Sequence, residues 1–102
     1  MSVASAAIAR TVQDRQPVGD GPYPDGSQVW CWSRIDNPGA KKRRIRHIWY
    51  HGTQQKAAVG LDIKSTSWRT WSRIPAHGTG AWRVDIVDED GRVMKSLPFT
   101  VE

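Results

Sequence analysis

Short stretches rich in β-branched and aromatic residues alternate along the chain with turns that contain glycine or proline. No window shows a sustained helical period, whereas several stretches alternate apolar and polar side chains with period two. Trp82, Val84 and Ile86, for example, fall on one face of a strand, and Arg83 and Asp85 fall on the other. The pattern predicts an all-β fold, an antiparallel immunoglobulin-like β-sandwich of about seven strands.

The sequence predicts a single domain. All 102 residues fit a single unit, with a first strand near 6–14, a proline- and glycine-rich loop over 15–26, and a sandwich body over 27–102. The strands of the body are expected near residues 28–35, 45–51, 56–63, 68–74, 80–88 and 93–101. The turn before the last strand contains Asp90-Gly91, a strong hairpin signal because glycine tolerates a positive φ.

The six tryptophans are predicted to divide between the core and the surface. Trp49 shares a strand face with Ile45, and Trp82 shares one with Val84, so both tryptophans are expected in the core. Arginines interleave with tryptophans in Trp68-Arg-Thr-Trp-Ser-Arg73 and Trp82-Arg83, and on a strand Arg69, Trp71 and Arg73 share one face. Such a face either braces the sheet through cation–π contacts or binds a partner's side chains or sugar rings. This predicted surface comprises Trp30, Trp32, Arg69, Trp71 and Arg73.

Positive charge is concentrated in one predicted loop. The chain has 15 lysines and arginines against 10 aspartates and glutamates, a formal net charge of +5 that favours anionic partners. A basic run between the second and third strands either contacts an acidic membrane surface or an acidic protein, or is simply a solvated loop. Nucleic acid is not expected as a partner, because no recognition helix or zinc finger accompanies the run. This anionic-surface patch comprises Lys41, Lys42, Arg43, Arg44 and Arg46.

The residue types that carry catalysis or bind metals form no recognisable pattern. Cys31 is the single cysteine, so it cannot form an internal disulfide and is expected in the core. His47 and His51 share a strand face but lie ~13 Å apart, too far to bind one ion. His47 is expected to be half-buried with a hydrogen-bond partner. We therefore expect no enzymatic activity, no catalytic residue, no metal and no cofactor.

Short strings spread from about residue 6 to residue 102 carry a family resemblance. They are Asp14-Arg-Gln-Pro17, Val29-Trp-Cys-Trp32, Ile45-Arg-His-Ile-Trp-Tyr50, Trp68-Arg-Thr-Trp-Ser72, Gly80-Ala-Trp-Arg-Val84, Asp90-Gly91 and Phe99-Thr-Val101. Together and in order, they resemble the bacterial family called domain of unknown function 2914. The resemblance implies a β-sandwich module without established activity, usually found in envelope or membrane-attached proteins. It implies no catalytic or ligand-binding residues.

The same resemblance implies a periplasmic or membrane-associated location. The chain shows no secretory signal, because residues 1–9 lack a basic segment, and no apolar run approaches the ~20 residues that span a bilayer. We expect a non-enzymatic interaction module that docks onto another protein or a larger assembly through the aromatic and arginine-rich face. The alternative is a carbohydrate- or cell-wall-binding module in which Trp30, Trp32 or Trp71 stacks on sugars.

Overall fold

The alternating segments of the sequence form nine β-strands, and the protein contains no helix. The computed structural model describes residues 1–102. The strands are β1 (Ser2–Ala9), β2 (Thr11–Gln13), β3 (Gln16–Val18), β4 (Gln28–Asp36), β5 (Arg43–His51), β6 (Gln54–Ile63), β7 (Ser67–Pro75), β8 (Gly80–Val87) and β9 (Val93–Val101). The predicted all-β fold is confirmed, and the strands of the sandwich body, β4 to β9, begin and end within about two residues of their predicted bounds.

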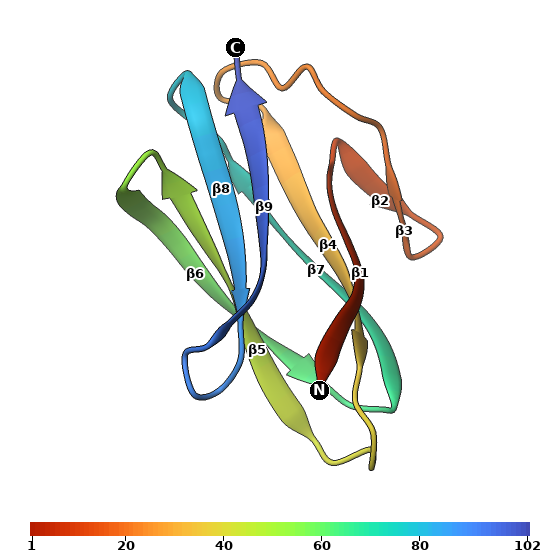
Figure 1. The fold of residues 1–102 in the computed structure, drawn as a ribbon. Helices are drawn as coiled ribbons and strands as arrows, with labels where there is room; N and C mark the ends of the chain where they lie inside the picture. Colours follow the sequence, from red (N-terminus) through yellow and green to blue (C-terminus); the bar gives the residue numbers. More distant parts are fainter.

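The strands pack in two layers, as in an immunoglobulin-like sandwich (Figure 1). One layer is the sheet β1-β4-β7, and the other is the sheet β6-β5-β8-β9. Every pair of neighbouring strands is antiparallel. The hairpin β2–β3 is separate from both sheets and contacts β1 and β4 (Figure 1). Because the chain passes repeatedly between the layers, each sheet combines strands that are distant in the sequence.

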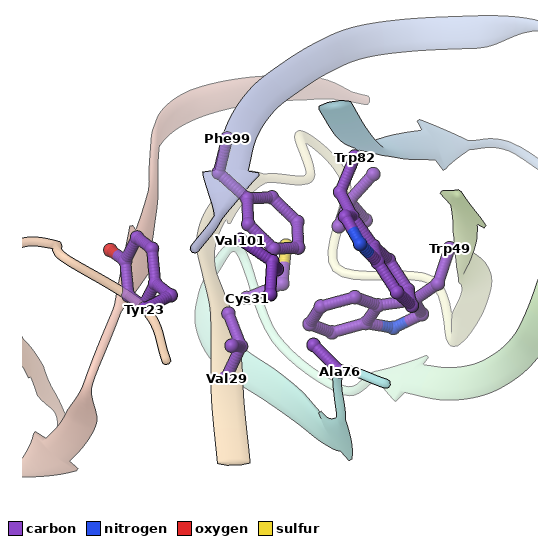
Figure 2. Packing of buried hydrophobic residues seen from close by; sticks show 9 residues of the cluster. Tyr23, Val29, Cys31, Trp49, Ala76, Trp82, Phe99 and Val101 are labelled. Atoms are coloured by element: carbon purple, nitrogen blue, oxygen red, sulfur yellow. The ribbon is translucent and has the colours of Figure 1, made fainter. Parts of the chain in front are cut away.

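The inward faces of the two layers meet in an aromatic core (Figure 2). Trp49 of β5 and Trp82 of β8 are buried there, as predicted. Phe99 of β9 packs against both, with ring centroids 6.1 Å from Trp49 and 5.9 Å from Trp82. The other end of the sandwich is filled by a smaller cluster of isoleucines: Ile35, Ile45, Ile63 and Ile86.

The N-terminal region differs from the predicted single strand over 6–14. β1 ends at Ala9, and residues 11–18 form the β2–β3 hairpin, so the predicted loop 15–26 begins with a short strand. The hairpin reverses at Asp14 and Arg15, whose φ values are 50° and 62°. Two positive φ values are typical of a type I′ turn, which usually contains asparagine and glycine. The sequence pattern did not indicate the turn because neither residue is present.

Candidate functional site

The outer surface of the sheet β1-β4-β7 carries the arginines and tryptophans of the predicted partner-binding surface. β4 and β7 pair in register along their lengths, so their outward side chains lie side by side. Arg69, Trp71 and Arg73 are all exposed on this side, as period two predicted. We call this surface the Arg–Trp face. Its cross-strand pairs are Trp30–Arg73, Trp32–Trp71 and Arg34–Arg69.

One cation–π contact braces the Arg–Trp face. The guanidinium carbon of Arg73 lies 5.4 Å from the centre of the Trp30 ring. A contact of this kind at an exposed site contributes ~0.5–1 kcal/mol. It holds Trp30 half-buried while Arg73 stays exposed, so bracing of the sheet leaves the guanidinium open to solvent.

Trp32 does not belong to the exposed surface, and its prediction as a binding residue is corrected here. It points outward from β4, but the β2–β3 hairpin covers it and only 4% of its surface is exposed. Its indole N–H donates a 2.9 Å hydrogen bond to the backbone carbonyl of Arg15 in the hairpin turn. Period two indicates the side of a sheet on which a residue lies, not what packs against that side. Trp32 therefore anchors the hairpin.

Trp71 is the exposed tryptophan of this face, with 38% of its surface accessible. Beside it lies a groove between the hairpin turn and the first half of β7. The cavity volume is about 610 Å³, which falls within the ~300–1,000 Å³ range of small-ligand sites. No acidic residue lines this groove, which is formed by Arg15, Ser65, Ser67, Trp68, Arg69 and Trp71.

The arginines of the Arg–Trp face have no acidic partner. The ion pairs of the structure involve other arginines: Arg43, Arg44 and Arg83. Arg34 and Arg69 occupy directly opposite positions on β4 and β7, where two like charges disfavour strand pairing. Asp36 lies two residues from Arg34 on the same face of β4, but it forms no ion pair with these arginines. Their guanidinium donors thus remain free to bind carboxylates or other anions.

Arg15 and Arg34 extend the site beyond the residues that the sequence pattern identified. Arg34 continues the period-two series of Trp30 and Trp32 along the same strand, so the pattern contained a signal for it. Arg15 reaches the groove from the hairpin turn. No local pattern indicates this, because its position depends on how the hairpin packs onto Trp32.

The predicted anionic-surface patch at 41–46 is divided by ion pairs. Nε of Arg43 lies 2.7 Å from Oε1 of Glu89, and Nη1 of Arg44 lies 3.4 Å from Oδ1 of Asp62. The patch is therefore less cationic in the structure than its sequence indicates. Its exposed members without an ion pair are Lys41, Lys42 and Arg46.

On the outer surface of the second layer, Arg83 is neutralised by a neighbouring carboxylate. Nε of Arg83 donates a 3.0 Å hydrogen bond to Oδ1 of Asp85, and the guanidinium carbon lies 4.3 Å from the centre of the Tyr50 ring. The hydroxyl of Ser96 donates to the same oxygen of Asp85 at 2.7 Å. Here the arginine and the carboxylate satisfy each other, in contrast to the Arg–Trp face.

A second group of chemically versatile side chains lies between the layers. Nδ1 of His47 lies 2.7 Å from Oγ of Ser72, and Nε2 of His47 lies 3.1 Å from Oγ of Ser33, so both ring nitrogens are hydrogen-bonded. The indole N–H of Trp49 donates to Ser72 at 3.3 Å, and Ser33 donates to the carbonyl of Thr70 at 3.5 Å. All of these groups are satisfied when neutral His47 carries its proton on Nε2, donates it to Ser33, and accepts at Nδ1 from the hydroxyl of Ser72. The chain of bonds joins the two sheets.

This buried chain is closed to ligands. Ser33 and His47 are completely buried, so no molecule in solution contacts them. The expected hydrogen-bond partner of His47 is present, but its expected half-burial is corrected to full burial. Burial lowers the pKa of His47 to about 4 and raises the pKa of the Cys31 thiol. Both groups are therefore neutral at neutral pH, and their role is in packing.

The fold and the Arg–Trp face define a small immunoglobulin-like β-sandwich with one donor-rich, arginine- and tryptophan-lined surface. The chain belongs to the family described as Protein of unknown function (DUF2914), which matches residues 42–101. The match covers β5 to β9 and thus Trp71 and the arginines beside it, whereas β1 to β4 precede it. No curated protein matches the sequence.

Two further structural observations bear on the site. No group of three or more histidine, cysteine, aspartate or glutamate side chains is placed so that it could hold a metal ion. The structure has no helix with the length and apolar character that a membrane crossing requires.

Proposed function

We propose that the chain is a non-catalytic interaction module of a bacterial envelope or membrane-associated assembly, and that it docks onto another protein through the Arg–Trp face. The family resemblance supports the envelope setting. The contrast between Arg83 and the arginines beside Trp71 supports the docking surface. Arg83 is neutralised by Asp85 on one side of the sandwich, whereas Arg69 and Arg73 flank an exposed Trp71 without any acidic partner on the other.

Arginine and tryptophan are the residue types that contribute most to protein–protein binding. They are enriched at hot spots, where truncation to alanine weakens binding by ~2 kcal/mol or more. Trp71 offers a rigid apolar surface, and the two flanking arginines offer planar sets of N–H donors. A partner with carboxylates around an apolar centre would complement this arrangement in shape and in charge.

A photo-reactive amino acid in place of Trp71 is expected to capture a partner protein in the native cells. The matched control replaces Lys95, which is exposed on β9, the strand at one edge of the opposite layer. The crosslink should appear at position 71 only, and it should disappear when Arg69→Glu and Arg73→Glu are added. The same crosslinked species from both positions, or none from position 71, would contradict the proposal.

A second candidate is a carbohydrate- or cell-wall-binding module. It is favoured by the exposed indole of Trp71 beside the Ser65 and Ser67 positions in the groove, because indole faces stack on sugar rings. If this is the function, peptidoglycan fragments or common polysaccharides should shift the tryptophan fluorescence of the folded protein, and Trp71→Ala should remove the shift. An unchanged spectrum across the set of polysaccharides would exclude this candidate.

A further inference from the structure

We propose that the partner contributes an acidic segment that binds in an extended conformation along the free edge of β7. Its side chains at alternate positions would place carboxylates against Arg69 and Arg73 and an apolar group against Trp71. The inference rests on the proposed function, because it names the chemistry and the conformation of the protein that docks on the Arg–Trp face.

The first observation is that β7 has an unpaired edge. It pairs with β4 on one side and has no strand on the other, so its outer row of backbone N–H and C=O groups is available. An extended peptide can add a strand to such an edge, with main-chain hydrogen bonds providing affinity. The groove lined by Arg15 and Arg69 lies beside the same strand and would receive the outward side chains of an added segment.

The second observation is the spacing along β7. Arg69, Trp71 and Arg73 occupy alternate positions and share the outer face, so they repeat every ~6.6 Å. An added strand has the same repeat, and each outward side chain would meet one of the three. A glycan carries no row of main-chain amides with this period. The spacing and the free edge together favour a peptide over a sugar chain.

The third observation is the charge along the edge. Arg69 faces Arg34 across the strand pair, and neither forms an ion pair with a carboxylate. An incoming carboxylate would relieve this repulsion and gain charge-assisted hydrogen bonds. A second copy of β7 would instead bring further arginines against Arg69 and Arg73. The edge thus discriminates against self-pairing and in favour of an acidic strand.

The fourth observation is the backbone of Arg15. Its φ is 62°, a left-handed conformation that glycine adopts without strain and that arginine rarely adopts. Strained residues of this kind cluster at functional sites. The Trp32 hydrogen bond holds the carbonyl of Arg15 in place, while the side chain lines the groove opposite Arg69. The hairpin turn thus has arginine at a strained position, and the guanidinium of this Arg15 would be placed to bind an acidic segment.

The test uses a fluorescein-labelled peptide as long as β7, 9 residues. Glutamate stands at its third and seventh positions, valine at the fifth, and threonine elsewhere, so that either strand direction presents the same pattern. Binding to the full chain is followed by fluorescence anisotropy. The glutamate peptide should bind at least about tenfold more tightly than a version with lysine at the same two positions, and its affinity should fall as salt is added.

Backbone methylation separates strand addition from simple charge attraction. Two N-methylated peptides are compared, one for each alternate set of amides, because successive amides of a strand point to opposite edges. Only one of the two methylated peptides should bind more weakly, by about tenfold or more, while the other should bind like the unmethylated peptide. Equal affinity of both methylated peptides and the parent would overturn the inference.

Substitutions in the protein locate the bound peptide. Arg69→Glu with Arg73→Glu should weaken binding at least about tenfold, whereas Arg92→Glu with Lys95→Glu, the same change of charge on exposed residues near β9, should leave it within about twofold. Arg15→Gly should raise the urea midpoint of unfolding and yet weaken binding, because glycine relieves the strained φ and removes a guanidinium. Equal effects of the two charge reversals would place the peptide elsewhere.

The failures of the two proposals are distinguishable. A crosslink at position 71 with no binding of the glutamate peptide would retain the docking function and refute the acidic strand. Binding of polygalacturonate that depends on Arg69 and Arg73, without binding of the peptide, would refute the strand in favour of an acidic glycan. An acidic strand on β7 requires that the peptide binds, that one methylated peptide loses binding, and that the Arg69 and Arg73 reversal weakens binding at least about tenfold.

Discussion

Replacing Trp49 by alanine is expected to lower the free energy of unfolding by about 3–5 kcal/mol. The side chain is completely buried at the centre of the aromatic core, where Phe99 packs edge-on against it. Its indole N–H also donates to Ser72 in the hydrogen-bond chain between the layers. Truncation would leave a cavity and remove one of the hydrogen bonds of Ser72. The loss would remove much of the ~5–15 kcal/mol that stabilises a domain of this size.

Thermal and urea unfolding measure this loss, and Trp71→Ala is the matched control. The same residue type is removed from the exposed Arg–Trp face, where a substitution usually changes stability by no more than ~0.5 kcal/mol. The midpoint of thermal unfolding should fall by more than ~12 °C for Trp49→Ala and by only a few degrees for Trp71→Ala. Similar midpoints for the two variants would contradict the division of the tryptophans between core and surface.

Acidification is expected to destabilise the fold through His47. Burial holds the pKa of His47 at about 4 in the folded protein, against an ordinary value of 6.5. Between these two pH values the unfolded chain binds a proton that the folded protein does not, so the free energy of unfolding falls as pH falls. The slope is ~1.4 kcal/mol per pH unit, and the total loss approaches roughly 3 kcal/mol at pH 4.

The hydrogen-bond chain explains why a proton on His47 is unfavourable. A charged ring has two N–H donors, but Oγ of Ser72 already accepts from Trp49. The hydroxyl of Ser72, which is buried between the sheets, would then lose the acceptor that it uses in the neutral state. The hydrogen bonds that join the two sheets therefore require the neutral form of His47.

Urea midpoints measured between pH 4 and pH 7 test the effect of His47. His47→Gln should flatten the pH dependence in this range, whereas His77→Gln should not, because His77 is exposed in the loop before β8. The aspartates and glutamates are the same in both variants, so their contribution to the pH dependence cancels when the variants are compared. A slope that is unchanged in His47→Gln would show that another group binds the proton.

The site and the core are opposite sides of the same two strands. Ser33 of β4 and Ser72 of β7 point inward to His47, while their neighbours Arg34 and Trp71 point outward to the Arg–Trp face. The buried hydrogen bonds therefore fix the sheet that presents the proposed docking surface. Such support limits the side-chain entropy lost on binding, because the backbone beneath the site is already ordered.

Local patterns were sufficient for the fold class and for most of the strand faces. The pleat of a β-strand alternates side chains with a period of two, whatever the rest of the chain does. For this reason the sequence alone placed Trp49 and Trp82 in the core and Arg69, Trp71 and Arg73 on an outer face, as the structure confirms. Glycine at the Asp90-Gly91 turn marked the last hairpin for an equally local reason, its tolerance of positive φ.

The tertiary structure decided which outward residues remain open and which charges remain unpaired. Trp32 and Trp71 share one face, yet the hairpin covers Trp32 and leaves Trp71 exposed. Arg43 looked like part of a cationic patch, but β5 brings it to Glu89, which is far away in the sequence. Coverage and ion pairing depend on segments that meet only after folding. A period of two contains no information about these long-range contacts, so the sequence pattern could not predict them.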